Sequence, residues 1–337
     1  MRGLMVCGEY PDIRVGRITS ALRDNGIKHG VVTLRYPPQF DFAYDFIDWN
    51  HTDGSKKLID RAMKHQCDVY HVHGELYHFW PVEALKERTD KPVILNVHDL
   101  ASARPNTTLD VWEESGIAAA DALVWVTEEQ RVFAEALGFD VDKPYAIVPN
   151  YVSSRYFIDK KVLPHIGGVV VHGGTLKRGE NPTSIDYSAT SDALEGQLHV
   201  IPGGDDPDYG IVHPTEMDYG ILMHRLSQFD WGFCGTPNPD AVWGMALPTK
   251  VGEYFAAGIP VIALNCPPVK KFCDMGMGIY LTDVRDVPKA AATDPKPYVK
   301  NVLKYRSQFT TERAIAPLVE LYKALDVPFI PDHHFGM

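Results

Sequence analysis

The sequence contains little cysteine and no long apolar run. Its five cysteines are odd in number and form no CxxC pair, a pattern that disfavours both a disulfide framework and a zinc ribbon. No stretch approaches the roughly 18 apolar residues that a membrane-spanning helix needs, and the first segment has too few apolar residues for a signal-peptide core. We therefore expect a soluble cytoplasmic protein without a transmembrane segment, for which peripheral membrane contact stays open.

Positive charge is also scarce, because 33 Lys and Arg stand against 44 Asp and Glu and leave a formal net charge of −11. This balance gives no general attraction for nucleic acid or anionic lipid, so a nucleic-acid partner is disfavoured. The glycine-rich GxGxxG loop is missing from the first strand-to-helix turn, "CGEYPDIRVGR". Its absence disfavours a nicotinamide-dependent dehydrogenase.

What the sequence does contain is a regular alternation of short apolar segments with polar, helix-like ones. The length of 337 residues exceeds the usual size of a single core. One series of strands fills the first 150 residues, and a second follows the linker-like stretch "NYVSSRYFIDKKVLPHIG". The predicted strands are GLMVCG, GVVTLR, DVYHVHG, PVILNVHD, ALVWVT, YAIVPN, GGVVVHGG, GQLHVIPGG, FDWGFCG, GIPVIAL and GIYLT. The pattern predicts two α/β halves, each built on a parallel sheet.

A last helix is predicted over residues 310–325, "TTERAIAPLVELYKAL". Apolar side chains recur in it at helical spacing, namely Ile315, Leu318, Val319, Tyr322 and Leu325. Pro317 lies inside this pattern, and proline removes a helical hydrogen bond and clashes with the preceding turn. We therefore expect a kink near residues 313–317, in a helix that could span two domains.

Four segments together resemble a known family. "ALPTKVGEYFAAGIPVIA" (246–263) is the most specific, and "VPNYVSSRYF", "PVILNVHDL" and "SQFTTERAIAPLVELYKAL" accompany it in the family's order over most of the chain. This set resembles the GT-B fold glycosyltransferases of the family 4 type. The resemblance implies two Rossmann-like, doubly wound domains facing across a cleft, with the acceptor mainly on the N-terminal side. It implies residues 1–155 and 156–309 as the two domains, with 310–337 returning as a kinked helix to the first.

Glu253, near the start of the helix in the most specific segment, matches the family glutamate that accepts hydrogen bonds from the ribose hydroxyls of the nucleotide. A carboxylate suits this task because it offers two acceptor oxygens to two adjacent hydroxyl donors, in charge-assisted bonds. The alternative interpretation is an acid stabilised by the helix dipole at a helix start. With the surrounding match, ribose binding is the prediction.

The family often carries a second glutamate eight residues earlier, where this chain has Met245. Contacts to the donor sugar must then come from elsewhere, and we expect them from the main chain around Met245, Ala246 and Leu247, because a glycine-containing loop lets backbone approach a ligand. Lys250, at the same helix start as Glu253, is a further donor-binding candidate.

Cleavage of a glycosyl phosphate places charge on the departing diphosphate, and fixed cations lower that barrier. "HGGTLKRGEN" (172–181) follows a predicted strand and supplies Lys177 and Arg178, which we predict as the phosphate clamp. Gly174 and Thr175 would border the donor, with Thr175 at the position where the family commonly has arginine. The alternative is a solvated basic turn.

His98 follows an apolar strand in "NVHDL" and matches the family histidine that reaches the donor sugar near the reacting centre. Neutral imidazole donates or accepts a hydrogen bond, so His98 is predicted as catalytic, although not as a nucleophile. In the first strand-to-helix turn, Gly8 is assigned to the donor phosphates. Arg14 and Gly16 are assigned to the acceptor side.

"HVHGELYHFWP" (71–81) raises a metal hypothesis through His71, His73, Glu75 and His78. We prefer a lining of the acceptor site, with Tyr77 as a sugar contact, because a catalytic zinc site needs a defined third ligand and second shell. The resemblance implies retaining transfer without metal or other cofactor, and the DPD triplet in "PGGDDPDYG" is interpreted as a turn because of its Pro and Gly. No metal site is therefore predicted.

The leading hypothesis is a metal-independent, hexosyltransferase-like enzyme that moves a sugar from a nucleoside diphosphate to a hydroxyl acceptor, such as a glycan, a glycolipid or a small molecule. A non-catalytic GT-B module that binds nucleotide sugar or glycan is the alternative, motivated by Met245 and Thr175. A glycosyltransferase acting on DNA bases is disfavoured by the acidic balance. A nucleotide-sugar 2-epimerase, which uses the same fold, also stays open.

Overall fold

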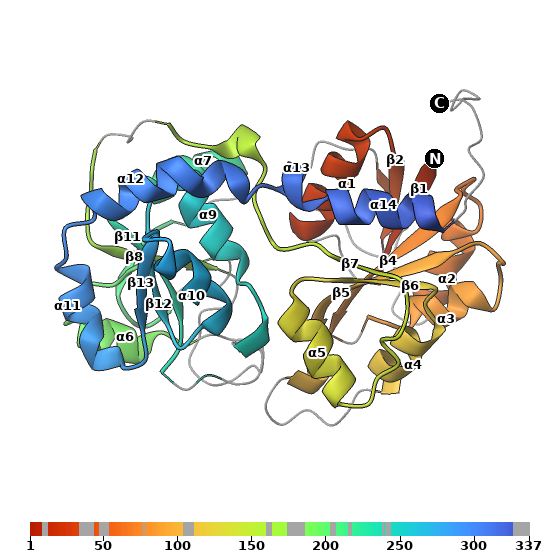
Figure 1. Cartoon of the computed structure of the whole chain (residues 1–337), viewed down its shortest axis with the longest axis horizontal. Helices are drawn as coiled ribbons and strands as arrows, with labels where there is room; N and C mark the ends of the chain where they lie inside the picture. The colour runs from red at the N-terminus through yellow and green to blue at the C-terminus, as the bar shows by residue number, and fades with distance from the viewer. Residues whose placement is uncertain are drawn as a thin grey trace. The chain divides into compact units, whose positions relative to one another are not determined.

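The computed structural model shows a chain that divides into two compact α/β units. The structure describes residues 1–8, 13–33, 44–46, 54–76, 78–103, 111–159, 164–173, 186–202, 207–214, 218–237, 239 and 244–325. The described residues of the first unit fall within Met1–Ser102, Thr107–Val148 and Ile315–Met337, and those of the second within Ala103–Asn106 and Pro149–Ala314. The chain thus leaves the first unit after Val148 and rejoins it at Ile315 (Figure 1).

The first unit is built on a seven-stranded parallel sheet of order β3-β2-β1-β4-β5-β6-β7. Its strands are β1 Arg2–Cys7, β2 Lys28–Thr33, β3 Tyr44–Phe46, β4 Val69–Leu76, β5 Val93–Leu100, β6 Ala122–Trp125 and β7 Tyr145–Ile147. Its helices are α1 Ile13–Asp24, α2 Gly54–Ala62, α3 Pro81–Lys86, α4 Val111–Ala119, α5 Glu128–Ala136 and α14 Ala316–Ala324, with a 3₁₀ turn η1 at Ala101–Ala103. The strand order reverses between β1 and β4, which makes this pair the topological switch point.

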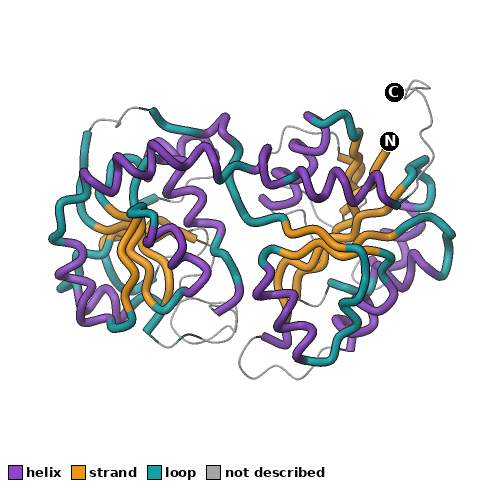
Figure 2. The backbone as a smooth tube through the Cα atoms, viewed as in Figure 1, coloured by secondary structure: helices purple, strands orange, loops and turns teal. Residues whose placement is uncertain are grey.

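The second unit repeats this plan with a six-stranded parallel sheet of order β10-β9-β8-β11-β12-β13 (Figure 2). Its strands are β8 Val169–Gly173, β9 His199–Pro202, β10 Ile211–Val212, β11 Trp231–Gly235, β12 Val261–Leu264 and β13 Gly278–Leu281. Its helices are α6 Ser188–Ala193, α7 Tyr219–Leu226, α9 Thr249–Ala257, α10 Pro267–Asp274, α11 Val287–Ala291, α12 Lys296–Tyr305 and α13 Thr311–Ala314, with 3₁₀ turns η2 Ser154–Tyr156, η3 Val284–Asp286 and η4 Arg306–Gln308. Here the switch point lies between β8 and β11.

The expected architecture of two α/β halves, each on a parallel sheet, is confirmed, and every predicted strand is present. The short strands β3 and β10 were not predicted, because three and two residues are too few to show a period. Several strands of the two sheets are apolar and buried on both faces, as in Ala122–Trp125 and Val261–Leu264, where all four residues are buried. That composition belongs to parallel sheets covered by helices on each side.

The last predicted helix is divided into two helices and is not a single kinked one. It consists of α13 and α14, and Ile315 separates them. Pro317 lies in the first turn of α14, where its missing N–H leaves no helical bond unmade. Two helices therefore replace the expected kink, because proline starts the second one.

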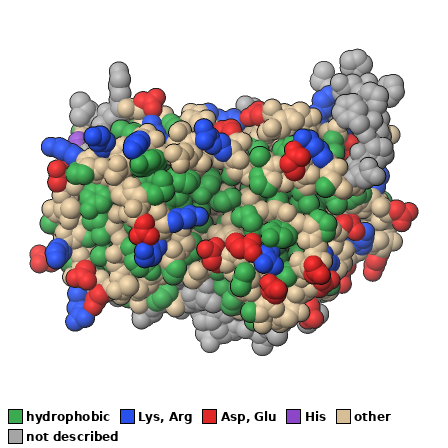
Figure 3. Space-filling view, viewed as in Figure 1, with side chains coloured by type: hydrophobic (Ala, Val, Ile, Leu, Met, Phe, Trp, Pro, Cys, Tyr) green, Lys and Arg blue, Asp and Glu red, His purple; other side chains and the backbone are tan. Residues whose placement is uncertain are grey.

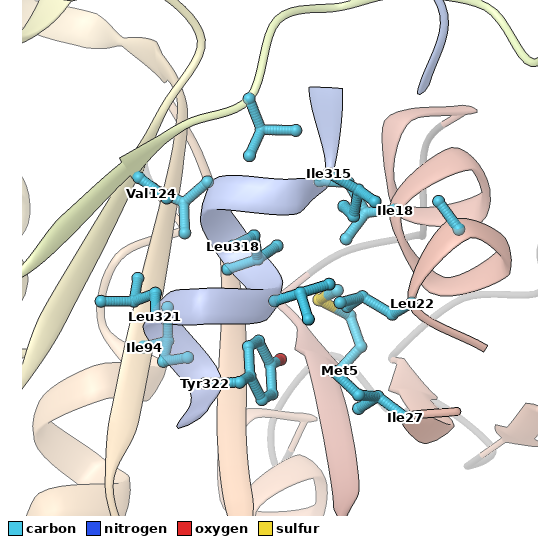
Figure 4. Packing of buried hydrophobic residues seen from close by; sticks show 14 of the residues in the cluster. Met5, Ile18, Leu22, Ile27, Ile94, Val124, Ile315, Leu318, Leu321 and Tyr322 are labelled. Atoms are coloured by element: carbon cyan, nitrogen blue, oxygen red, sulfur yellow. The ribbon is translucent and has the colours of Figure 1, made fainter. Parts of the chain in front are cut away.

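Helix α14 packs into the core of the first unit together with α1. Figure 4 shows Leu318, Leu321 and Tyr322 directed toward side chains of β1, β5, β6 and α1. The buried cluster includes Met5, Ile18, Leu22, Ile27, Ile94, Val124, Ile315, Leu318, Leu321 and Tyr322. Burying side chains of this size stabilises the docked helix by roughly 1.5–3 kcal/mol each in area terms. The end of the described chain is thus an integral part of the first unit.

Candidate functional site

Two polar clusters lie at the switch points of the two sheets, and each is described within its own unit. The carboxylate cluster of the second unit consists of Glu253, His172 and Tyr219. The histidine cluster of the first unit consists of His73, His98, Asn96 and Arg14. In open parallel sheets, ligands bind beyond the carboxyl ends of the strands at the switch point, so both clusters occupy the place where the fold itself favours a site.

Glu253 is positioned by a helix that is buried all round. Every residue of α9 from Lys250 to Ala257 is buried, and the helix ends at Gly258, whose φ of 78° suits a left-handed cap. A Cβ at Gly232 would lie 2.2 Å from the Tyr254 ring, so the absence of that Cβ lets Tyr254 lie across β11. The Tyr254 hydroxyl then donates to the Phe233 carbonyl at 2.8 Å. Helix α9 is thereby fixed against β11.

The Glu253 carboxylate meets two polar side chains from distant parts of the second unit. His172 Nε2, at the carboxyl end of β8, lies 2.8 Å from Oε2. The Tyr219 hydroxyl, at the start of α7, donates to Oε1 at 3.0 Å, and its ring packs edge-on against Tyr156 with centroids 4.7 Å apart. Glu253 itself is 3% exposed. The hydrogen bond from Tyr219 orients the carboxylate, His172 lies beside its other oxygen, and each oxygen has lone pairs for a further donor.

Lys250 lies one turn before Glu253 and points into the unit. Its Nζ donates to the Tyr187 hydroxyl at 2.9 Å and lies 5.0 Å from the centre of that ring. Desolvation by burial lowers the pKa of Lys250 to about 8, against the opposing effects of Cys234 and Glu253. Its predicted contact with the donor stays a prediction.

The main chain before α9 is held by the linker between the units. The Asn150 side-chain amide donates to the Leu247 carbonyl at 3.3 Å, and Met245 is buried, while Ala246 is half-buried. A Cβ at Gly252 would approach the Asn150 carbonyl to 3.0 Å, so the helix packs closely on the linker. The sugar contacts predicted for Met245, Ala246 and Leu247 stay predictions.

Five predicted residues lie outside the described part of the chain. They are Gly174, Thr175, Lys177 and Arg178, which follow β8 in the sequence, and Tyr77, which follows β4. In the sequence, the predicted phosphate clamp comes shortly after Gly173, the last residue of β8. Its predicted function therefore remains a prediction that rests on the sequence.

The histidine cluster contains the predicted catalytic residue His98, on β5. The His98 ring lies against the His73 ring of β4, with centroids 5.4 Å apart and planes inclined by 35°. Asn96 Nδ2 donates to His73 Nδ1 at 3.2 Å. His73 and Asn96 are both buried, whereas His98 is half-buried, so His98 is the member of the cluster that reaches the surface of the unit.

The other N-terminal predictions lie near this cluster. Gly8 follows β1, and a Cβ there would lie 2.9 Å from the His78 Cβ, so glycine permits close packing at the switch point. Arg14 is 1% exposed on α1, bound to Asn96 and to the Val148 carbonyl, and Gly16 is buried on the same helix. Their predicted donor and acceptor contacts stay predictions.

His71 and His73, two residues of the metal hypothesis, have different polar neighbours. His71 Nδ1 lies 2.8 Å from the Tyr322 hydroxyl, whereas His73 faces Asn96. Within the described residues, no group of three or more His, Cys, Asp or Glu is gathered as a metal site requires. No helix in the described part of the chain is long and apolar enough to cross a membrane.

Sequence reasoning missed His172, Tyr219 and Asn96. His172 carries a detectable signal, because like His98 it ends an apolar strand, in "VVVHGG". Tyr219 and Asn96 carry none, since each acquires its partner only through packing.

Comparisons with known proteins bear on the fold of the chain. Residues 13–155 match Glycosyltransferase Family 4. No curated protein matches the chain. Sucrose-phosphate synthase from Thermosynechococcus elongatus superimposes with a TM-score of 0.71 at 14% identity, covering 96% of this chain and 98% of its own.

Two further solved structures show the same likeness over nearly the full length. Anabaena HepE in complex with UDP gives a TM-score of 0.69 at 11% identity, over 96% of this chain and 100% of its own. WaaG, a glycosyltransferase involved in lipopolysaccharide biosynthesis, gives 0.63 at 13% identity, over 97% and 99%. The fold is therefore the GT-B fold of glycosyltransferases. The resemblance to the family 4 type is confirmed, and the family match itself covers the N-terminal half.

Proposed function

We propose that this protein transfers a sugar from a nucleoside diphosphate to a hydroxyl acceptor. The observation that carries the proposal is the position of Glu253, a buried carboxylate at the switch point of the second sheet whose two oxygens are aligned by His172 and Tyr219. Adjacent ribose hydroxyls are the ligand that two such acceptors fit. The N-terminal match to Glycosyltransferase Family 4 and the full-length likeness to HepE, crystallised with UDP and with UDP-glucose, support the same function.

The nucleotide would bind to the second unit, with the ribose on Glu253 and the diphosphate near Lys177 and Arg178. As the glycosyl phosphate bond breaks, charge grows on the diphosphate, and these cations stabilise it. His98 would hydrogen-bond a hydroxyl of the donor sugar near the reacting carbon. Transfer would proceed with retention and without a metal ion, the leaving phosphate assisting removal of the acceptor proton. A hexose is the proposed sugar and a carbohydrate hydroxyl the proposed acceptor.

The charge distribution disfavours DNA as the acceptor. Acidic and basic side chains are interspersed on the face of the described chain shown in Figure 3, and the net charge is −11. Nucleic-acid binding relies on Lys and Arg that neutralise successive phosphates. A cytoplasmic enzyme acting on a carbohydrate acceptor is the proposed setting.

The test is nucleotide binding by isothermal titration calorimetry, with UDP, GDP, ADP and dTDP and their sugar conjugates. We expect one nucleotide, UDP in the first instance, to bind, and Glu253→Gln to weaken it by at least tenfold, since the amide keeps the shape and loses one acceptor. Glu195→Gln, at an exposed position of the same unit, is the matched control. Binding that survives Glu253→Gln unchanged would contradict the proposed site.

Turnover separates the alternatives. Transfer of radiolabelled sugar to an acceptor, or slow hydrolysis of the donor, is expected for the wild type and is lost in Glu253→Gln. Binding without either reaction would identify a non-catalytic module. Conversion of the donor sugar without transfer would identify a 2-epimerase.

A further inference from the structure

The histidine cluster contains an unbroken line of hydrogen bonds that ends beside His98. It begins at Arg14 on α1, continues through Asn96 on β5 and reaches His73 on β4. Arg14, Asn96 and His73 are 1%, 0% and 2% exposed. Polar groups buried to this degree are costly unless they are paired, so the order of donors and acceptors in this line is constrained.

That order follows from the Arg14 guanidinium, which can only donate hydrogen bonds. Arg14 directs Nε and Nη2 at Asn96 Oδ1, at 3.2 and 3.0 Å, and Nη1 at the Val148 carbonyl, at 2.7 Å. Guanidinium has no acceptor, so the amide oxygen of Asn96 must face Arg14. The amide nitrogen then faces His73 Nδ1 at 3.2 Å.

The amide nitrogen also only donates, and this fixes the tautomer of His73. Nδ1 must present its lone pair to Asn96 Nδ2, so in neutral His73 the ring hydrogen is on Nε2. When a neighbour fixes whether one ring nitrogen of a neutral histidine carries the hydrogen, it also fixes whether the other nitrogen donates or accepts, as in metal sites and catalytic triads. Arg14 therefore controls His73 through the orientation of a single amide.

His73 meets His98 ring to ring, at 5.4 Å between centroids. The His98 main chain is held separately, because Gln130 Nε2 on α5 donates to the His98 carbonyl at 3.0 Å. The backbone of His98 is thus fixed from one side and its imidazole is packed from the other. His73 is too deeply buried to contact a substrate itself, so its effect on chemistry passes through His98.

We propose that Asn96, oriented by Arg14, holds His73 as the Nε2–H tautomer, and that His73 in this form positions the His98 imidazole for sugar transfer. Asn96 and His73 are positioning residues rather than catalytic ones. The positioning part rests on the proposed function, whereas the tautomer part concerns the ligand-free protein alone. An aromatic residue at position 73 would fill the same space, and what histidine adds is the hydrogen on Nε2.

The decisive variant is Asn96→Asp. Aspartate has nearly the shape of asparagine and still accepts from Arg14, but it turns a second oxygen toward His73 Nδ1, so the hydrogen moves to that nitrogen. Imidazole ¹⁵N NMR of the ligand-free protein reports this directly, with the His73 signals assigned by their loss in His73→Gln. We expect an Nε2–H pattern in the wild type and a protonated Nδ1 in Asn96→Asp.

Kinetics test the consequence for His98. We expect kcat to fall by 10- to 100-fold in Asn96→Asp, while KM for the donor changes by less than threefold. His73→Gln keeps an N–H near the place of Nε2 and should retain kcat within about fivefold, whereas His73→Phe should not. If Asn96→Asp does not fold, the comparison of Gln and Phe at position 73 provides the same test.

Three results would overturn the proposal. An Nδ1–H pattern for wild-type His73 would contradict the tautomer, and equal kcat in the Gln and Phe variants would contradict the positioning role. Unchanged kcat in a folded Asn96→Asp whose tautomer has switched would contradict it as well. Wild-type protein that binds nucleotide and transfers no sugar would overturn the proposed function and the positioning with it, while the NMR result would still establish the tautomer.

Discussion

His172 Nε2 lies 2.8 Å from Glu253 Oε2 in the second unit, and it joins the end of β8 to the start of α9 across the switch point of the sheet. The contact is nearly enclosed, since the two side chains are 10% and 5% exposed. A carboxylate in such surroundings interacts more strongly with its neighbours than one in water. The pair therefore defines how Glu253 presents its oxygens to a ligand.

Removing His172 should weaken nucleotide binding. We expect His172→Ala to raise the Kd for the bound nucleoside diphosphate about tenfold, because Glu253 loses the group that fixes Oε2. His172→Gln places an N–H near the position of Nε2 and should restore most of the affinity. Calorimetric titration of both variants measures this effect, and equal affinities in the Ala and Gln variants would show that His172 does not orient Glu253.

Replacing the buried amine at position 250 should stabilise the protein. Burial lowers the pKa of Lys250 from 10.5 to about 8, so between these values the unfolded chain binds a proton that the native chain does not. Stability therefore rises with pH across this window, by on the order of 3 kcal/mol at 1.36 kcal/mol per pKa unit. Lys250→Met should remove that pH dependence. It should also raise the free energy of unfolding at pH 7 by about 1 to 2 kcal/mol, a net value that allows for the lost hydrogen bond to Tyr187.

Urea unfolding between pH 7 and 10 measures the difference between Lys250→Met and wild type, which should shrink as pH rises. Lys323→Met, at a lysine 62% exposed on α14, is the control. A difference that stays constant with pH would contradict the predicted protonation of Lys250. The same variant should bind nucleotide more weakly if Lys250 contacts the donor.

Lowering the pH below 6.5 should decrease the free energy of unfolding of the first unit, partly through His29. The Tyr322 hydroxyl of α14 lies 2.9 Å from His29 Nε2 and 2.8 Å from His71 Nδ1, and desolvation lowers the pKa of His29 to about 4 and that of His71 well below 6.5. As pH falls from 6.5 toward 4, the unfolded chain takes up protons that these rings do not, so stability decreases. In urea unfolding experiments, His29→Gln should reduce the loss of unfolding free energy between pH 6.5 and 4. His224→Gln, at an exposed position, should leave that loss unchanged.

Gly3 provides the space in which His29 reaches Tyr322. The two residues are partners in the register of β1 and β2, and a Cβ at Gly3 would lie 2.1 Å from His29 Nε2. Gly3→Ala should displace the imidazole and cost roughly 1 to 3 kcal/mol of stability. Gly244→Ala, where a Cβ meets nothing within 4 Å, is the control for thermal unfolding, and equal melting temperatures would contradict the expected clash.

The sequence by itself determined the sheets, the order of the strands along the chain and the start of the helix that contains Glu253. Those features are local, because apolar runs, turn residues and a proline before a helix depend on neighbours within a few positions. The same local signals identified His98 at the end of a strand. They also predicted an apolar helix over residues 310–325, although as one kinked helix and not as the two helices α13 and α14.

Only the tertiary structure decided which side chains meet. The crossover order of each sheet brings β8 beside β11 and β4 beside β5, so His172 reaches Glu253 and His73 reaches Asn96 across large separations in sequence. It also turned Lys250 inward to Tyr187 and buried Arg14 against Asn96. Residue type and spacing do not predict such pairings. The topology of a parallel sheet determines which strands have neighbouring carboxyl ends, and the hydrophobic period of the strands does not contain that information.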